Sequence, residues 1–241
     1  LVYDVMFFAH VHLAGQGYQF VLHGHEDQIT GATLFVLHAE DARGRLDGHL
    51  DFDIGDREGR FDLHSSLELP LLLKAWAGLP PLRDIVIGGG QALDAEGEFK
   101  LGENNIPQVH MTGSASLESV MLRGVRFDQV RSSFAWRQGE LFLRDVRLTR
   151  NDGEATGKAM IQWPIVRLAL ESTFPEQVYK PLFIGQPLEK VIGDFSDRKG
   201  AEVHVFLEGG FDATDKHSWA YTGGGSVKNV NYKGVPVNSA E

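Results

Sequence analysis

The sequence predicts an all-β protein, mainly antiparallel, in which short helical insertions interrupt a series of strands. Apolar and polar residues alternate with period two in many segments, for example 60–67 and 141–150. Turn-forming residues separate such segments, as in 137–140. Strands that follow one another without a helix between each pair favour an antiparallel sheet. A further observation is that a pattern of roughly 107 residues occurs twice.

The clearest part of this repeat joins residues 44–52 to residues 153–161. The segments "GRLDGHLDF" and "GEATGKAMI" have both glycines in register, and every second residue is apolar or small. The intervening residues are mostly polar and differ between the copies. Because side chains alternate between the two faces of a strand, each copy is expected to have one apolar face. The residues expected to point inward together, and to line a candidate apolar groove, are Leu46, Leu50, Phe52, Ala155, Ala159, Ile161 and Trp163.

The segment "DGEATGKA" (152–159) also resembles a phosphate-binding loop. Such a loop has four residues between its first glycine and the Gly-Lys pair, and then serine or threonine. Here three residues separate Gly153 from Gly157, and Ala159 stands where the hydroxyl would be. The segment is therefore interpreted as a strand, and no nucleotide is expected to bind.

Other segments extend the repeat with small changes in offset, as loop insertions would produce. The offset is 106 or 110 residues in the further pairs, which are 73–86 with 179–192, 96–101 with 202–207, and 111–125 with 221–235.

The repeat predicts three parts of the chain. Residues 1–60 hold the end of a first repeat unit plus an N-terminal hairpin, 61–166 form a complete unit, and 167–241 start a further unit. The chain opens without methionine, and its strand pattern continues to the end. We therefore expect it to be part of a longer protein.

Each repeat carries one helical insertion, around 69–88 and 175–195, that is broken in its middle by glycine and proline. Their apolar stripes favour helices that plug an end or edge of the sheet. A membrane-surface role would require a basic polar face, and here that face is mixed. The run "GGGQ" (88–91) is interpreted as a helix-terminating loop.

Four histidines lie near the start, in "AHVH" (9–12) and "HGH" (23–25). A hairpin turning at Gly15-Gln16 would make His10 and His23 diagonal neighbours, within reach of one metal ion. Histidines on a strand with an apolar reverse face are typically exposed polar positions. We therefore expect no metal site here, and shared metal binding by His10 and His23 is the alternative.

The composition excludes several classes of function. The formal charge of −10 argues against nucleic acid as a partner, and no cysteine is present for a disulfide or thiolate site. No motif for nucleophilic or zinc-dependent hydrolysis occurs. We therefore expect no enzyme and no cofactor, although a carboxylate pair that meets only in space would escape this test.

Residues 131–161 resemble the recurring segment of the AsmA-like/TamB superfamily of bacterial envelope proteins. In that family a strand, a short turn, a strand, a glycine turn and another strand recur along very long chains. Residues 226–237 are similar to the strand pair that starts such a segment, and the likeness covers most of 30–241. The broken helix pair in each repeat departs from the family's pattern.

The resemblance implies an elongated, taco-like β-groove lined with apolar side chains. It also implies a periplasmic chain whose parent protein is anchored in the inner membrane, with envelope proteins as partners. Its cargo would be phospholipid or another acyl-chain lipid. A closed sandwich with a dry core is the alternative architecture. The alternative functions are a structural or partner-binding repeat module and a cryptic enzyme.

Overall fold

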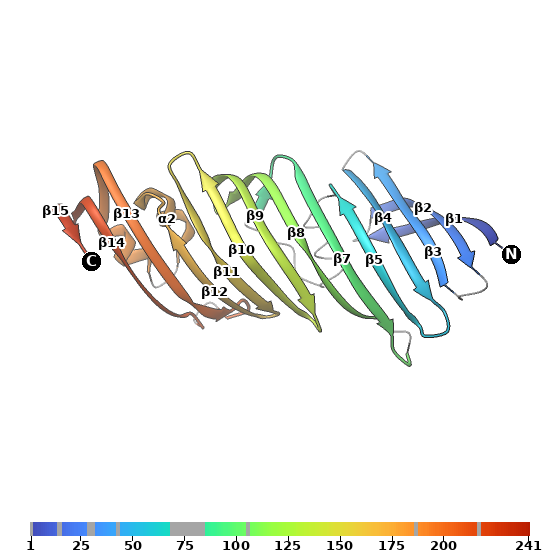
Figure 1. Ribbon diagram of the computed structural model, residues 1–241. Coiled ribbons are helices and arrows are strands. Elements are labelled where there is room, and N and C mark those ends of the chain that lie inside the picture. Colours follow the sequence, from blue (N-terminus) through green and yellow to red (C-terminus); the bar gives the residue numbers. More distant parts are fainter. Residues whose placement is uncertain are drawn as a thin grey trace. The chain divides into compact units, whose positions relative to one another are not determined.

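The structure is a computed structural model that describes residues 2–13, 16–27, 32–41, 44–67, 85–104, 107–185, 188–215 and 218–241. Strands dominate this part of the chain, and two short helices interrupt them (Figure 1). The predicted all-β fold with helical insertions is therefore confirmed. The strands are β1 (Val2–Leu13), β2 (Gln16–Asp27), β3 (Ala32–Asp41), β4 (Gly44–Asp53), β5 (Glu58–Ser65), β6 (Ile85–Ile87), β7 (Gln91–Leu101), β8 (Pro107–Leu122), β9 (Val125–Arg137), β10 (Glu140–Arg150), β11 (Gly153–Gln162), β12 (Ile165–Ser172), β13 (Phe195–Asp212), β14 (Ala220–Tyr232) and β15 (Val235–Ala240). The helices are α2 (Glu176–Leu182) and α3 (Glu189–Gly193).

The strands follow one another in a single sheet in chain order, except that β6 pairs with β8 beside this series. The pairs from β1 to β5, and from β11 to β15, are antiparallel. Such a meander needs only short connections between strands.

The chain folds into two compact units. Unit 1 contains Leu1–Leu82, Gly90–Ser116 and Ser133–Leu141, and unit 2 contains Arg83–Gly89, Leu117–Ser132 and Phe142–Glu241. These units are groups of contacting residues. The sequence boundaries proposed for the repeat, at 60/61 and 166/167, stay a prediction.

The hairpins β4–β5 in unit 1 and β11–β12 in unit 2 have the same register. Gly48 lies opposite Leu63, and Gly157 lies opposite Leu170. A Cβ atom added to either glycine would lie 2.6 Å from the Cδ2 atom of that leucine. The paired glycines that reveal the repeat in the sequence are therefore positions with no room for a side chain.

The next strand shows that one predicted alignment is wrong. On β7, Gly97 lies opposite Phe61, and on β13 Gly209 lies opposite Leu168, which is the residue equivalent to Phe61. Residue 97 therefore corresponds to residue 209, an offset of 112, whereas the pairing of 96–101 with 202–207 assumes 106.

Residues 85–87 also differ from the prediction, because they form β6 and not part of a helix. Ile85 lies opposite Leu122, just as Phe195 at the start of β13 lies opposite Tyr232. The glycines of 88–90 consequently join two strands instead of ending a helix, and the amide of Gly88 donates to the carbonyl oxygen of Ser119 at 3.0 Å. The remainder of this predicted insertion, 69–84, lies outside the described residues.

The second insertion is helical and broken as predicted, into α2 and α3. Pro175 precedes α2 with φ near −65°, which suits a helix start. Gly185, with φ of +76°, follows the helix in a conformation that favours glycine.

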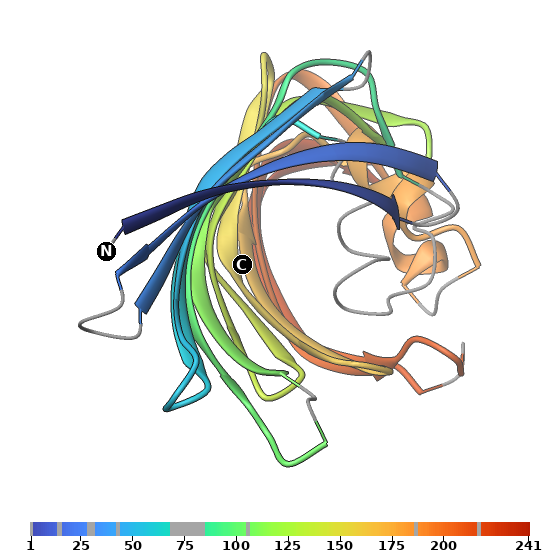
Figure 2. The same ribbon diagram turned by 90° about the vertical axis from the view of Figure 1, so that its right-hand side faces the viewer.

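Helix α2 packs on one face of unit 2, on the concave side of strands β12 to β14 (Figure 2). Val178 on α2 is 1% exposed, and Phe174 just before the helix is 3% exposed. The Phe174 ring lies against Phe127 with 5.5 Å between the ring centroids. The buried cluster consists of Val120, Val125, Phe127, Ala155, Phe174 and Val178.

Candidate functional site

The candidate site is an apolar face of unit 2, which we name the inner face. Directly opposed residues of antiparallel strands lie on one face, and successive residues of a strand alternate. The register pairs Gly157 with Leu170, and Leu170 with Leu207. The inner face therefore comprises Ala155, Gly157, Ala159 and Ile161 on β11, Val166, Leu168, Leu170 and Ser172 on β12, and Val205, Leu207, Gly209 and Phe211 on β13.

The inner face is covered at one end and partly exposed beyond it. Ala155, next to α2, is 6% exposed. Farther along the strands every aliphatic and aromatic member of the inner face is only half-buried. These side chains shield one another from water. None of them is fully enclosed, whereas residues between two packed layers would be.

Unit 1 has an equivalent face with the same gradient. Leu46 and Leu63 are buried near the point where the chain leaves β5. Phe52 and Phe99 are half-buried toward the other end, and their rings stack with centroids 5.7 Å apart. Gly59 lies between them in the register, so the rings meet across a position without a side chain.

The glycines of both faces do not leave empty space. Leu63 lies over Gly48, Leu170 over Gly157, and the ring of Phe134 over Gly113. Bulky neighbours therefore fill the gaps that small residues create. Any ligand on these faces would lie on a surface of interleaved side chains and not in slots at the glycines.

The predicted lining residues divide between the two units. Leu46 is buried, Leu50 and Phe52 are half-buried, and all three are in unit 1. In unit 2, Ala155 is buried, whereas Ala159 and Ile161 are half-buried. The last residue, Trp163, lies in the turn after β11 and is 44% exposed. That both sets line one connected groove stays a prediction.

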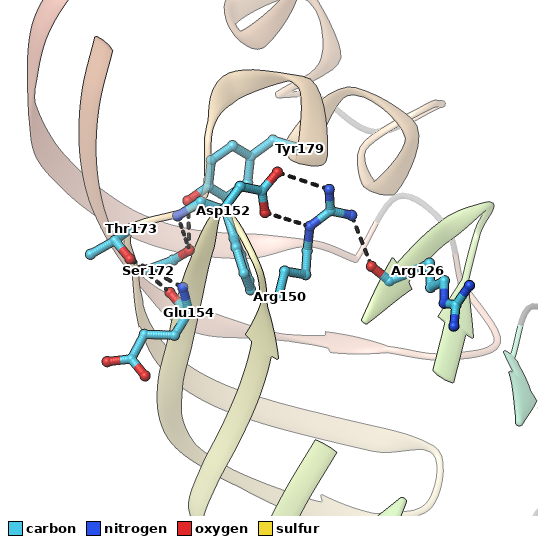
Figure 3. A network of polar contacts seen from close by, with 8 residues as sticks. Arg126, Arg150, Asp152, Glu154, Ser172, Thr173 and Tyr179 are labelled. Carbon is cyan, nitrogen blue, oxygen red and sulfur yellow. Dashed lines mark hydrogen bonds and ion pairs between the residues drawn. The ribbon is translucent and has the colours of Figure 1, made fainter. Parts of the chain in front are cut away.

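A polar network fixes the corner where the chain leaves β12 for α2 (Figure 3). The hydroxyl of Ser172 accepts hydrogen bonds from the amide of Phe174 at 3.2 Å and from the Tyr179 hydroxyl at 2.7 Å. Beside it, the amide of Glu154 donates to the Thr173 hydroxyl at 3.2 Å. These bonds hold Phe174 and α2 against the inner face.

The network continues through an ion pair. The Arg150 guanidinium binds both carboxylate oxygens of Asp152, at 2.7 and 2.9 Å, and donates to the carbonyl oxygen of Arg126 at 2.8 Å. The pKa of Asp152 is lowered, chiefly by the hydrogen bonds from Arg150. The pKa of Tyr179 is raised, because burial disfavours the phenolate. The network was not predicted. The sequence signal that could have located its corner is the repeated hydroxyl pair, Ser65-Ser66 and Ser172-Thr173, at an offset of 107 residues.

A hollow of about 680 Å³ lies mainly on the other face of unit 2. Lys158, Met160, Arg167 and Ala169 line it, and their positions alternate with those of the inner face. Its lining also includes Glu208 and Asp212, so it combines apolar side chains with charged ones of both signs. The inner face beyond α2, by contrast, is wholly apolar.

The N-terminal hairpin does not have the register assumed for a metal site. His10 lies opposite Gln19, and His23 lies opposite Met6. The two histidines are thus four positions apart along the ladder and are not diagonal neighbours. Among the side chains that the structure describes, no group of histidine and carboxylate residues is arranged to hold a metal ion.

No helix in the described ranges has the length and apolar character needed to cross a membrane. Comparison with protein-family models, curated proteins and solved structures finds no match to this chain.

Proposed function

We propose that the chain is a segment of a bacterial envelope protein that carries phospholipid along an apolar sheet face between the inner and outer membranes. The observation that carries the proposal is the half-buried, wholly apolar inner face beyond α2. Each methylene of an acyl chain that is buried on this face would contribute about 0.8 kcal/mol to the free energy of binding. It would need no polar partner there.

The resemblance to the AsmA-like/TamB superfamily supports the same proposal. On this basis the chain is periplasmic, its parent protein is anchored in the inner membrane outside this segment, and its partners are envelope proteins. It has no catalytic role in this proposal. The equivalent face in unit 1 supports a surface that recurs along the chain, since both copies are buried at one end and half-buried beyond it.

The alternative is a structural or partner-binding repeat module without lipid cargo. The filling of the glycine positions by Leu63 and Leu170 favours this alternative, because it makes each face more even and better suited to packing against another protein surface. Both functions use the same fold, so only the bound molecule separates them.

Native mass spectrometry and lipid extraction of the purified protein test the proposal. We expect co-purified phospholipid, and less of it in the Ala159→Trp variant, because the indole would occupy the inner face. Thr156→Trp is the matched control, since Thr156 is exposed on the same strand and faces the other way. A lipid-free wild-type protein, or equal lipid loss in both variants, would support the structural module.

A further inference from the structure

Imidazole and carboxylate groups alternate in a row across four neighbouring strands of unit 1. His38 on β3 lies opposite Asp47 on β4, Asp47 lies opposite His64 on β5, and His64 lies opposite Asp94 on β7. All four residues are on the face opposite Leu46 and Leu63. We name them the His–Asp row.

Two contacts in the row are direct hydrogen bonds. Nδ1 of His38 lies 2.8 Å from Oδ1 of Asp47, and Nδ1 of His64 lies 2.6 Å from Oδ1 of Asp94. All four side chains are partly exposed, so protons and salt reach them from solvent. Each bond joins neighbouring strands, and it becomes an ion pair when the imidazole is protonated.

The surroundings of the row are mainly acidic. Arg45 on β4 also pairs with Asp47. In the next row His49 lies 3.2 Å from Asp62, and Glu96 lies opposite Asp62. On the β2 side Val21 lies opposite His38, and on the β8 side Gly113 lies against the backbone carbonyl of Asp94.

These charges favour protonated histidine at the centre of the row. The pKa of His64 is raised, first by its hydrogen bond to Asp94 and further by the charges of Asp94, Asp62 and Asp47. The pKa of Asp47 is lowered, chiefly by Arg45 and then by His38. The Asp47 carboxylate therefore stays ionised at pH values where histidine takes up a proton.

The second copy of the repeat provides an internal comparison. The positions equivalent to Asp47, His64 and Asp94 are Thr156, Glu171 and Phe206, which also lie opposite one another. This second row contains no histidine–carboxylate pair. The same sheet geometry thus occurs once with histidine–carboxylate pairs and once without them.

We infer that the His–Asp row is a proton-dependent clasp, which holds β4, β5 and β7 together more tightly when His64 is protonated. A group whose pKa is higher in the folded than in the unfolded chain stabilises the fold below its unfolded pKa, near 6.5 for histidine. That stabilisation is lost as the pH rises through the folded pKa. For the His64 contribution, the clasp is therefore closed in mildly acidic solution and loosens toward neutral and alkaline pH.

Hydrogen–deuterium exchange of the whole chain at about pH 5.5 and about pH 7.5 tests this inference, since histidine titrates between these values. After correction for the intrinsic exchange rates, amides of β4 and β5 should be protected several-fold more at the lower pH. The amides of β11 and β12 should show no such gain. A gain of equal size in both hairpins would overturn the inference.

The double variant His38→Gln/His64→Gln should lose this extra protection of β4 and β5 at low pH. Asp94→Asn keeps His64 and removes its partner's charge. This variant should lose part of the extra protection at low pH, and its His64 should have a lower pKa in an NMR titration. High salt should shrink the effect in the wild type, because the pairs are partly exposed. Unchanged pH dependence in both variants would contradict a clasp.

Discussion

The amide of Phe174 donates to the hydroxyl oxygen of Ser172 at 3.2 Å, and Leu67 and Ser65 make the same bond at 3.1 Å in the first copy of the repeat. A further bond recurs with it. The amide of Thr173 donates to the Glu154 carbonyl, as that of Ser66 does to the Arg45 carbonyl. Leu67 is 2% exposed, so both corners place a buried apolar residue on the sheet. The same local structure therefore occurs at the corner of both copies of the repeat.

Replacing Ser172 by alanine should destabilise unit 2. The change removes the acceptor for the Phe174 amide and for the Tyr179 hydroxyl, and leaves at least one buried donor unsatisfied. We expect a loss of about 1–3 kcal/mol in the free energy of unfolding, measured by urea denaturation. Thr156→Ala, on the exposed face of β11, is the control and should change stability by less than about 0.5 kcal/mol. Equal effects of the two variants would show that the corner bonds add nothing.

The sequence was sufficient to predict this hairpin pair but not the register of the strand that follows. Alternation along a strand shows which residues share a face, and paired glycines such as Gly48 and Gly157 fix the alignment. On β7 the true and predicted offsets, 112 and 106, differ by an even number. A slip of an even number of residues keeps the same residues on the same face, so alternation cannot detect it.

Other differences also have physical causes. The apolar triplet Ile85–Ile87 is too short for its pattern to separate helix from strand, and pairing with β8 makes it a strand. The His–Asp row was missed because its members, such as Asp47 and His64, become neighbours only through pairing between strands. Alternation predicted which residues line the inner face. Their exposed fraction could not be predicted in this way, because it depends on how far α2 covers the face.

Replacing Gly157 by alanine should be costly although the change is small. The added Cβ atom would lie 2.6 Å from the Cδ2 atom of Leu170 and would collide with the backbone carbonyl of Ala169. Because backbone must move, we expect a loss of about 1–3 kcal/mol by urea denaturation. Gly193→Ala is the matched control, since nothing lies within 4 Å of its added Cβ. A neutral Gly157→Ala variant would show that the strands adjust freely.

Aspartate substitutions should separate the covered end of the inner face from its open part. Val178→Asp places a charge in the cluster with Phe127 and should cost about 3–5 kcal/mol in urea denaturation. Leu168→Asp lies on the half-buried stretch, where water reaches the carboxylate, and should cost about 1–2 kcal/mol. If both variants lost the same stability, the inner face would be a dry core, and its proposed use as a lipid surface would fail.

Stability at alkaline pH should depend on Tyr179. Its pKa is raised above the ordinary value of 10.0 because the phenol is largely buried, where it donates to Ser172. In the unfolded chain the phenol ionises near pH 10, whereas the folded chain retains the proton. The unfolded state therefore binds fewer protons, and stability falls as the pH rises above 10, by up to about 1.4 kcal/mol per pH unit until the folded phenol ionises. Tyr179→Phe should be less stable than the wild type at pH 8 and should lack this part of the alkaline decline. Parallel stability curves of the two proteins between about pH 8 and pH 11, from urea denaturation, would show that Tyr179 titrates like a solvent-exposed phenol.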